Sequence, residues 1–168
     1  QAGTYEVVAK FKDTTGNYVE LDNLTAKLVI NKATYDMSGV SFDDITDVYN
    51  GKEHVLVITG NLPEGVSVSY TANKLTNVGT LEVIATFTGD YDNYNEIDQM
   101  TATLIITKKV IEGISFTGKT VTYNGEVHSL SITGVLPSGV EVSYENNDKS
   151  QAGTYEVVAK FKDTTGNY

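Results

Sequence analysis

Apolar and polar residues alternate along much of this chain with a period of two. In the clearest run, Leu81 to Phe87, every second residue is leucine, valine, alanine or phenylalanine. Residues 155–161 repeat that pattern, and shorter alternating runs occur at 66–70 and 104–106. Such alternation is typical of β-strands with one buried face, and no run has the spacing of a helix. The pattern predicts an all-β protein.

Turn signals separate these runs. Asn50-Gly51 and Asn124-Gly125 each stand between apolar segments, and this dipeptide predicts a β-hairpin. Both prolines lie in Leu-Pro-x-Gly segments, at 62–65 and 136–139, where proline fixes φ and glycine can adopt φ > 0. Many short strands separated by turns predict antiparallel β-sandwiches of immunoglobulin-like (Ig-like) architecture.

Two levels of repetition organise the chain. Residues 1–18 recur without a change as residues 151–168, 150 positions later. Residues 49–94 also match residues 123–168, with an offset of 74 and identity at about half of the positions. Exact identity over the long period and partial identity over the short one indicate that the natural unit is a pair of dissimilar repeats. The chain is therefore expected to be a window on a tandem array.

The remaining offset is 76, because residues 18–32 match residues 94–108. The chain accordingly divides into the C-terminal part of one repeat (1–32), a complete Ig-like repeat (33–108) and the N-terminal part of the next (109–168). The joins are short and lack the Gly/Ser runs of flexible linkers. We expect stiffly coupled domains that form an elongated rod.

The repeated motifs resemble a known family. The pattern YNG..H...ITG.LP.GV.VSY occurs at 49–70 and 123–144, and is followed by GT.EV.A.F and, at 101–108, by TATL.I.K. These motifs resemble the MBG-type and related Ig-like repeats of bacterial cell-surface proteins, which occur in tandem in adhesins and stalks. The resemblance implies an extracellular setting, at the bacterial cell surface or secreted. Because turn and core residues carry it, it implies a fold and an array and names no ligand.

Composition removes several functional classes. The net charge is −10, and all 12 basic residues are lysines. An acidic chain without arginine lacks the charge needed to bind phosphate backbones, so no nucleic-acid partner is expected. There are no cysteines for disulfides or thiolate sites. No apolar run approaches the roughly 20 residues of a membrane span, and we expect no membrane insertion in this segment.

Residues suited to catalysis are few. His54 and His128, the only histidines, occupy equivalent positions after the Asn-Gly turns. Neither has a partner histidine at metal-ligand spacing or a serine and aspartate in a recognisable order. We expect both to be strand residues that pack beside the turn. The chain is therefore not expected to be an enzyme, and no cofactor is expected.

Acidic loops offer the oxygen ligands that calcium prefers. The equivalent acidic positions differ between the repeat types, whereas an ion required at every junction would need ligands in both. Solvated surface charge is thus the favoured interpretation, and no bound metal is expected. The clusters are Asp43, Asp44 and Asp47; the candidate ligands Asp90, Asp92 and Asp98, with Asn93; and, in the partner repeat, only Asp13 or Asp163 with Asp22.

Two classes of function remain. The first is a structural repeat of an extracellular bacterial stalk, adhesin or fibre. The second is a binding module for a glycan or a host surface protein, in which tyrosines such as Tyr91 and Tyr94 would form the binding face. Exact repetition, short joins and the lack of a distinctive surface cluster favour the structural class.

The repeat boundaries also make a prediction about partners. Residues 109–168 carry the first strands of a sandwich, and residues 19–32 have the sequence of the closing segment. Either the chain continues, or neighbouring copies complete one another head to tail, because an open strand edge is a template for pairing. The residues expected at that contact are Leu28 and Ile30 on one side, and Val157, Ala159 and Phe161 on the other.

Overall fold

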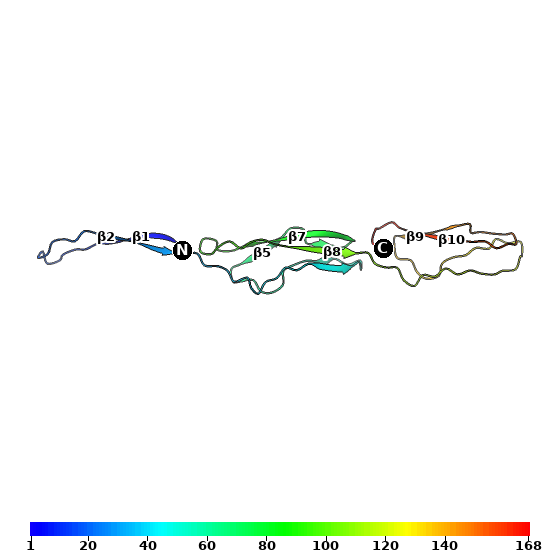
Figure 1. Ribbon diagram of the computed structural model, residues 1–168, viewed down its shortest axis with the longest axis horizontal. Coiled ribbons are helices and arrows are strands. Elements are labelled where there is room, and N and C mark those ends of the chain that lie inside the picture. Colours follow the sequence, from blue (N-terminus) through cyan, green and yellow to red (C-terminus); the bar gives the residue numbers. More distant parts are fainter. The chain divides into compact units, whose positions relative to one another are not determined.

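The computed structural model describes residues 1–168 and contains strands but no helix, which confirms the predicted all-β class (Figure 1). Accordingly, no helix is long and apolar enough to cross a membrane. The strands in chain order are β1 (Gly3–Ala9), β2 (Leu24–Ile30), β3 (Ile45–Val48), β4 (His54–Val55), β5 (Ser67–Tyr70), β6 (Lys74–Leu75), β7 (Gly79–Thr88), β8 (Met100–Thr107), β9 (Val140–Glu145) and β10 (Val158–Asp163).

The chain forms two compact units that do not coincide with the sequence repeats. Each unit holds one junction between successive repeats, the N-terminal junction in the first and the C-terminal junction in the second. The first unit contains Gln1–Asp44, Leu56–Asn73 and Glu82–Thr103, and the second contains Ile45–Val55, Lys74–Leu81 and Leu104–Tyr168.

In the first unit, β1 and β2 form an antiparallel ribbon (Figure 1). Tyr5 pairs with Leu28, and Gly3 pairs with Ile30. Every residue of both strands is exposed, and the side chains of Leu28 and Ile30 keep 52% and 45% exposure. A two-stranded ribbon is only marginally stable by itself, and this one has an apolar face without a cover.

The largest sheet has four strands in the order β3-β8-β7-β5. In the first unit, β5 pairs antiparallel with β7, with Ser67 opposite Thr88. In the second unit, β3 pairs with β8 in parallel, with Ile45 opposite Leu104. This parallel pair differs from the antiparallel pairing of β1 with β2, β4 with β6, β5 with β7 and β9 with β10. Parallel pairing is possible because a long crossover, which contains β4 to β7, separates the two strands along the chain.

The turn at Asn50-Gly51 is present, but the hairpin predicted around it is wrong. Gly51 has a φ of 76°, and the side chain of Asn50 accepts a hydrogen bond from the backbone N–H of Lys52 at 2.8 Å. The strand before the turn, β3, pairs with β8, whereas the strand after it, β4, pairs with β6. The two strands separate because each finds a partner farther along the chain.

The Leu-Pro-x-Gly turns are confirmed in both repeats. The backbone N–H of Val66 donates to the carbonyl of Pro63 at 3.1 Å, and that of Val140 donates to Pro137 at 3.1 Å. The glycine inside each turn has a positive φ, of 77° and 82°. This is the conformation for which glycine was expected.

The period-two pattern of the complete repeat corresponds to its buried positions, as predicted. The buried face of β7 and β8 carries alternate side chains, and residues from outside these strands also contribute to the core. In the first unit the buried residues are Tyr35, Leu56, Val83, Ala85, Phe87 and Ala102; in the second they are Leu104, Ile106 and Val140.

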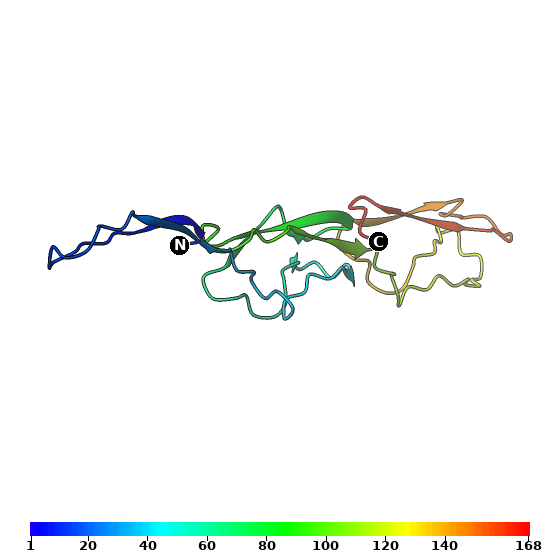
Figure 2. The same ribbon diagram turned by 60° about the vertical axis from the view of Figure 1, so that its left-hand side comes forward.

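The last strands, β9 and β10, form a second antiparallel ribbon, with Phe161 opposite Val142. Residues 109–139 run along one side of this ribbon (Figure 2). Isolated bridges, such as the one between Ser115 and Thr133, tie that segment together. The ribbon is less covered than its counterpart in the complete repeat, since Phe161 keeps 50% exposure.

Candidate functional site: the junctions between repeats

A buried asparagine forms the junction between the complete repeat and the one that follows it. The side-chain oxygen of Asn167 accepts a hydrogen bond from the backbone N–H of Val78 at 2.9 Å, and its amide group donates to Asn77 at 3.2 Å. Its backbone carbonyl accepts from the N–H of Lys109 at 3.0 Å. Asn167 is 4% exposed and the only buried polar residue. The side chain of Asn167 thus binds Val78, the residue immediately before β7 of the complete repeat. Its backbone carbonyl binds Lys109, the first residue of the next repeat.

The N-terminal junction repeats this arrangement. The side-chain oxygen of Asn93 accepts from the backbone N–H of Ala2 at 2.8 Å, and its carbonyl accepts from the N–H of Ala33 at 2.9 Å. Asn93 is the equivalent of Asn167 by the offset of 74. We call Asn93 and Asn167 the junction asparagines. In both, the side-chain oxygen and the backbone carbonyl make equivalent bonds, which indicates one common way of joining neighbouring repeats.

The two junctions differ at the positions beside the asparagine. Gln1 donates from its side chain to a carboxylate oxygen of Asp92 at 3.0 Å. At the other junction, Asn77 stands in place of Gln1 and Gly166 in place of Asp92, and Asn77 accepts a hydrogen bond from the junction asparagine instead. The residue pair beside the junction asparagine thus differs between the two junctions: Gln1 bonds to Asp92 at one, and Asn77 bonds to Asn167 at the other.

Aromatic rings and a lysine add to the C-terminal junction. The ring of Tyr168 meets the ring of Tyr49 edge to face, with centroids 5.5 Å apart. Lys108 donates from Nζ to the carbonyl of Tyr168 at 2.9 Å. Edge-to-face pairs of this kind add about 0.5 to 1.5 kcal/mol beyond the burial of their surface. Both contacts support the hydrogen bonds made by the preceding residue, Asn167.

The loop that presents Asn167 is held in shape by an aspartate. The carboxylate of Asp163 accepts hydrogen bonds from the N–H and hydroxyl of Thr165, at 2.8 and 2.7 Å, and from the N–H of Tyr168 at 2.8 Å. These bonds, with that of the Thr165 hydroxyl foremost, lower the pKa of Asp163 from 3.8 to about 2. Asp13 makes the same bonds in the identical N-terminal sequence. There the N–H of Tyr18 contributes most, followed by the N–H and hydroxyl of Thr15, and the pKa of Asp13 is lowered to about 2.

Two of the three candidate metal ligands accept hydrogen bonds from neighbouring protein groups. The carboxylate of Asp90 accepts from the side chain of Asn93 at 2.7 Å, and this bond lowers the pKa of Asp90. Asp92 accepts from Gln1. No group of three or more histidine, cysteine, aspartate or glutamate side chains is arranged to hold a metal ion, around Asp98 or elsewhere.

The two histidines lie next to the Asn-Gly turns, as expected from the sequence. His54 contacts the side-chain oxygen of Asn50 at 3.1 Å, and His128 contacts that of Asn124 at 3.0 Å. His54 also pairs with Asp47 at 2.8 Å, a residue that the second repeat replaces with valine. The shared contact is with the turn asparagine, and it supports the turn.

The tyrosines considered for a binding face pack within the first unit. The ring of Tyr94 stacks on that of Tyr35, with centroids 4.2 Å apart. The hydroxyl of Tyr91 donates to the carbonyl of Phe87 at 2.9 Å. Both residues keep part of their surface exposed, but one ring face of Tyr94 and the hydroxyl of Tyr91 are already occupied.

The five residues expected at a head-to-tail contact are divided between the two units. Leu28 and Ile30 face outward from β2, while Phe161 lies on β10 and is half exposed. Ala159 pairs with Tyr144 on β9. Their contact between copies stays a prediction.

The junction asparagines were not among the residues singled out from the sequence. A signal was nevertheless present, because an Asn-Tyr pair ends the same turn in all three copies, at 17–18, 93–94 and 167–168. Neither residue type suggests chemistry by itself. The partner of each side chain is a backbone N–H just before a strand, and the sequence does not distinguish one backbone N–H from another.

Comparison with known proteins identifies the family. The family model of the MBG domain matches the chain twice, over residues 38–110 and 113–168. No curated protein and no solved structure gives a significant match. The two matches adjoin one another and together cover well over half of the sequence. The chain therefore belongs to the MBG domain family, with two adjacent copies of the domain.

Proposed function

We propose that this chain is a structural segment of an extracellular bacterial surface protein, a spacer in a stalk, adhesin or fibre. MBG domains occur in cell-surface proteins, and two tandem copies are present here. The observation that carries the proposal is the bonding of Asn167 to Val78, which Asn93 repeats with Ala2. A spacer needs joints that transmit direction from one repeat to the next, and this contact supplies one.

The energetics of the joint support this role. A hydrogen bond contributes about 1 kcal/mol net, and a buried donor left unpaired costs about 1 to 3 kcal/mol. Bending the C-terminal junction would break the bonds of Asn167 to Val78, Asn77 and Lys109 together. Because the covalent join at Lys108 and Lys109 has no spare residues between these contacts, the bonds must open at the same time. We therefore expect the junction to resist bending.

The alternative function is a glycan- or host-protein-binding module. It requires accessible aromatic faces or a polar cluster that converges on a ligand. Tyr91 and Tyr94 use part of their surface for internal contacts, as the stacking of Tyr94 on Tyr35 indicates. No observation at the junctions favours a binding module. The experiment below is designed so that one of its results would support that alternative.

Small-angle scattering on the full chain, together with glycan-array binding, tests the proposal. The wild-type chain should keep one fixed maximum dimension, and a variant with Asn93→Ala and Asn167→Ala should show a broader distribution of dimensions. Asn17→Ala is the matched control, because it changes the same residue in the same local sequence where the side chain is exposed. Selective glycan binding, with no effect of the junction substitutions on scattering, would favour the binding module instead.

A further inference from the structure

The turn after β3 carries an asparagine-glycine pair, and two donors contact the side-chain oxygen of the asparagine. The backbone N–H of Lys52 donates to Oδ1 of Asn50 at 2.8 Å, and Nε2 of His54 lies 3.1 Å from the same oxygen. Asn50 and Gly51 are both exposed. All four residues belong to the complete repeat and to one of the two compact units, so the arrangement is local to one turn.

Two contacts hold the ring of His54 beside this turn. The residue pairs with Leu75 in the backbone ladder of β4 and β6, and its Nδ1 lies 2.8 Å from a carboxylate oxygen of Asp47. A carboxylate only accepts hydrogen bonds. The N–H of Lys52 identifies the other partner of the ring as the amide oxygen of Asn50, which is also an acceptor. Both ring nitrogens therefore donate, so this arrangement uses the doubly protonated, positively charged ring.

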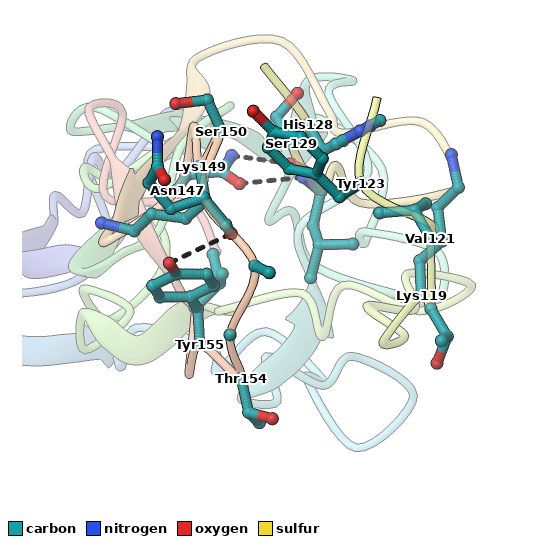
Figure 3. Close-up of a pocket in the computed structure, with 16 residues that line it drawn as sticks. Lys119, Val121, Tyr123, His128, Ser129, Asn147, Lys149, Ser150, Thr154 and Tyr155 are labelled. Atoms are coloured by element: carbon teal, nitrogen blue, oxygen red, sulfur yellow. Dashed lines mark hydrogen bonds between the residues drawn. The ribbon is translucent and has the colours of Figure 1, made fainter. Parts of the chain in front are cut away.

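The next repeat holds its histidine in the same way. By the offset of 74, His128 and Asn124 are the equivalents of the histidine and asparagine just described. The backbone of His128 exchanges two hydrogen bonds with that of Lys149, at 2.8 and 2.9 Å (Figure 3). Its Nε2 lies 3.0 Å from Oδ1 of Asn124, and the N–H of Glu126 donates to that oxygen at 3.0 Å. Two donors at the asparagine oxygen are thus common to both turns.

An asparagine followed by glycine can react with its own backbone. The glycine nitrogen loses its proton to solvent and attacks Cγ of the asparagine, and an electron pair of the carbonyl moves to Oδ1. The pair then returns, and the side-chain nitrogen takes a proton from solvent and leaves as ammonia. Water opens the resulting cyclic imide to aspartate or isoaspartate, so one water is consumed, one ammonia is released and nothing is oxidised. Donors at Oδ1 accelerate the reaction because this oxygen gains its negative charge in the transition state.

The turn leaves the attacking nitrogen uncovered. The hydrogen bond from Lys52 folds the side chain of Asn50 back along its own backbone, as in other Asx turns. The N–H of Gly51 has no backbone acceptor. A Cβ at Gly51 would meet only the hydroxyl of Tyr49, at 3.9 Å. With glycine at this position, no side chain lies over the nitrogen that must reach Cγ.

We propose that Asn50 is a site of self-modification, where the chain deamidates with the N–H groups of His54 and Lys52 as donors to the developing oxyanion. The inference goes beyond the proposed function, because it concerns a covalent change and involves no hydrogen bond of the junctions. Asp47 is a positioning residue, since it accepts one proton of the His54 ring while the other is directed at Oδ1. The reactants are the chain's own amide and water, so no cofactor or second protein is required.

The two turns should differ in rate because their charges differ. The side-chain amide of Asn124 donates to a carboxylate oxygen of Glu126 at 2.8 Å. This bond restrains the nitrogen that has to leave, and it places a negative charge beside the developing oxyanion. Lys52 occupies the position of Glu126 in the turn of Asn50, and a positive charge there favours the oxyanion. Asn50 should therefore react faster than Asn124.

Deamidation at Asn50 would change a turn that borders the C-terminal junction. Tyr49, which meets the ring of Tyr168 edge to face, directly precedes Asn50. Isoaspartate adds a methylene group to the backbone at this point, and aspartate adds a carboxylate beside His54. Either product would accumulate with the age of the molecule in the segment between β3 and β4.

Peptide mapping by mass spectrometry, during incubation of the full chain in neutral buffer, tests the proposal. Cleavage after lysine places Asn50 and Asn124 in different peptides, and fragment spectra locate the conversion of amide to carboxyl group. Asn50 should convert faster than Asn124 in the folded chain. In urea, where the donors at the two asparagine oxygens are lost, the sites should convert at similar rates.

Three variants assign the rate to the structure. His54→Phe keeps an aromatic ring without the donor, and it should slow conversion at Asn50 about fivefold, the effect of one net hydrogen bond. Lys52→Glu changes an exposed residue and should also slow Asn50. Glu126→Lys is the matched reverse exchange, and it should accelerate Asn124 while Asn50 keeps its wild-type rate. Circular dichroism checks that each variant is folded.

Faster conversion at Asn50 in the folded chain, slowed by both His54→Phe and Lys52→Glu, would support the proposal. Equal rates at the two sites, no conversion at Asn50, or a folded His54→Phe variant that converts like wild type would overturn it. A difference between the sites that persists unchanged in urea would assign the rate to the local sequence alone, and would also overturn the proposal.

Discussion

The side-chain oxygen of Asn167 lies 2.9 Å from the backbone nitrogen of Val78, a residue 89 positions earlier in the chain. The equivalent atoms of Asn93 and Ala2 are 2.8 Å apart, across a separation of 91 positions. Two contacts of the same type, made by equivalent residues in two dissimilar repeats, identify the element that the array reuses. It is an asparagine in a turn, and its side chain accepts a hydrogen bond from the residue immediately before a strand of the preceding repeat.

Replacing Asn167 with alanine should destabilise the C-terminal junction by about 1 to 3 kcal/mol, because the N–H of Val78 loses its partner in a partly buried place. Asn17→Ala, in the identical N-terminal sequence, should change stability much less because that side chain is exposed. Urea unfolding of both variants measures the difference. Equal free energies of unfolding for the two variants would contradict the role given to Asn167.

Acid should loosen the loop that presents Asn167. The pKa of Asp163 is lowered in the folded chain from 3.8 to about 2, so the ionised carboxylate stabilises the fold above about pH 4. That contribution is lost as pH falls through the folded pKa, near 2. An NMR titration should give a midpoint near 2 for Asp163 and faster amide exchange at Thr165 and Tyr168 below it. The substitution Asp163→Asn should remove this pH dependence, and a midpoint near 4 would show that the hydrogen bonds are not formed in solution.

Gly60→Ala should destabilise the complete repeat by roughly 2 kcal/mol or more, since φ is +90° and the new Cβ would collide with the carbonyl oxygen of Gly39. Gly134 meets Gly113 in the same way in the next repeat, so Gly134→Ala should have a similar effect there. Gly118→Ala is the control, because no atom lies within 4 Å of its Cβ position. Thermal unfolding by circular dichroism compares the three, and a Gly60 variant as stable as the Gly118 variant would refute the close approach.

Removing divalent cations should leave the melting temperature unchanged. Asp90 and Asp92 already accept hydrogen bonds from Asn93 and Gln1, and an ion would have to displace these donors. Differential scanning calorimetry with EDTA or with added calcium measures the effect. A clear fall in melting temperature with EDTA would reveal a stabilising ion bound to ligands such as Asp98.

The sequence predicted the strands well where one face is buried. The alternation from Leu81 to Phe87 identified the inward residues of β7, and the Leu-Pro-x-Gly segments identified their turns. It failed at Asn50-Gly51, where the dipeptide correctly predicted a turn but not which strands pair. Pairing of β3 with β8 depends on contacts between residues far apart in the chain, and local turn chemistry does not contain them.

The junction could be predicted only in part. Short joins without glycine or serine runs indicated close coupling between repeats, and the offsets of 74 and 76 indicated the alternation. The asparagines escaped notice because their partners are backbone N–H groups of Ala2 and Val78, which any residue except proline offers. Recognising them required the three-dimensional proximity of positions about 90 residues apart.

The most direct test of the central claim is a set of residual dipolar couplings for residues 33–108 and 109–168 of the intact chain. If the bonds of Asn167 to Val78 and Lys109 fix the joint, one alignment tensor should fit both repeats in the wild type. The Asn167→Ala variant should require two tensors of different magnitude. A wild-type chain that already requires two such tensors would contradict the account.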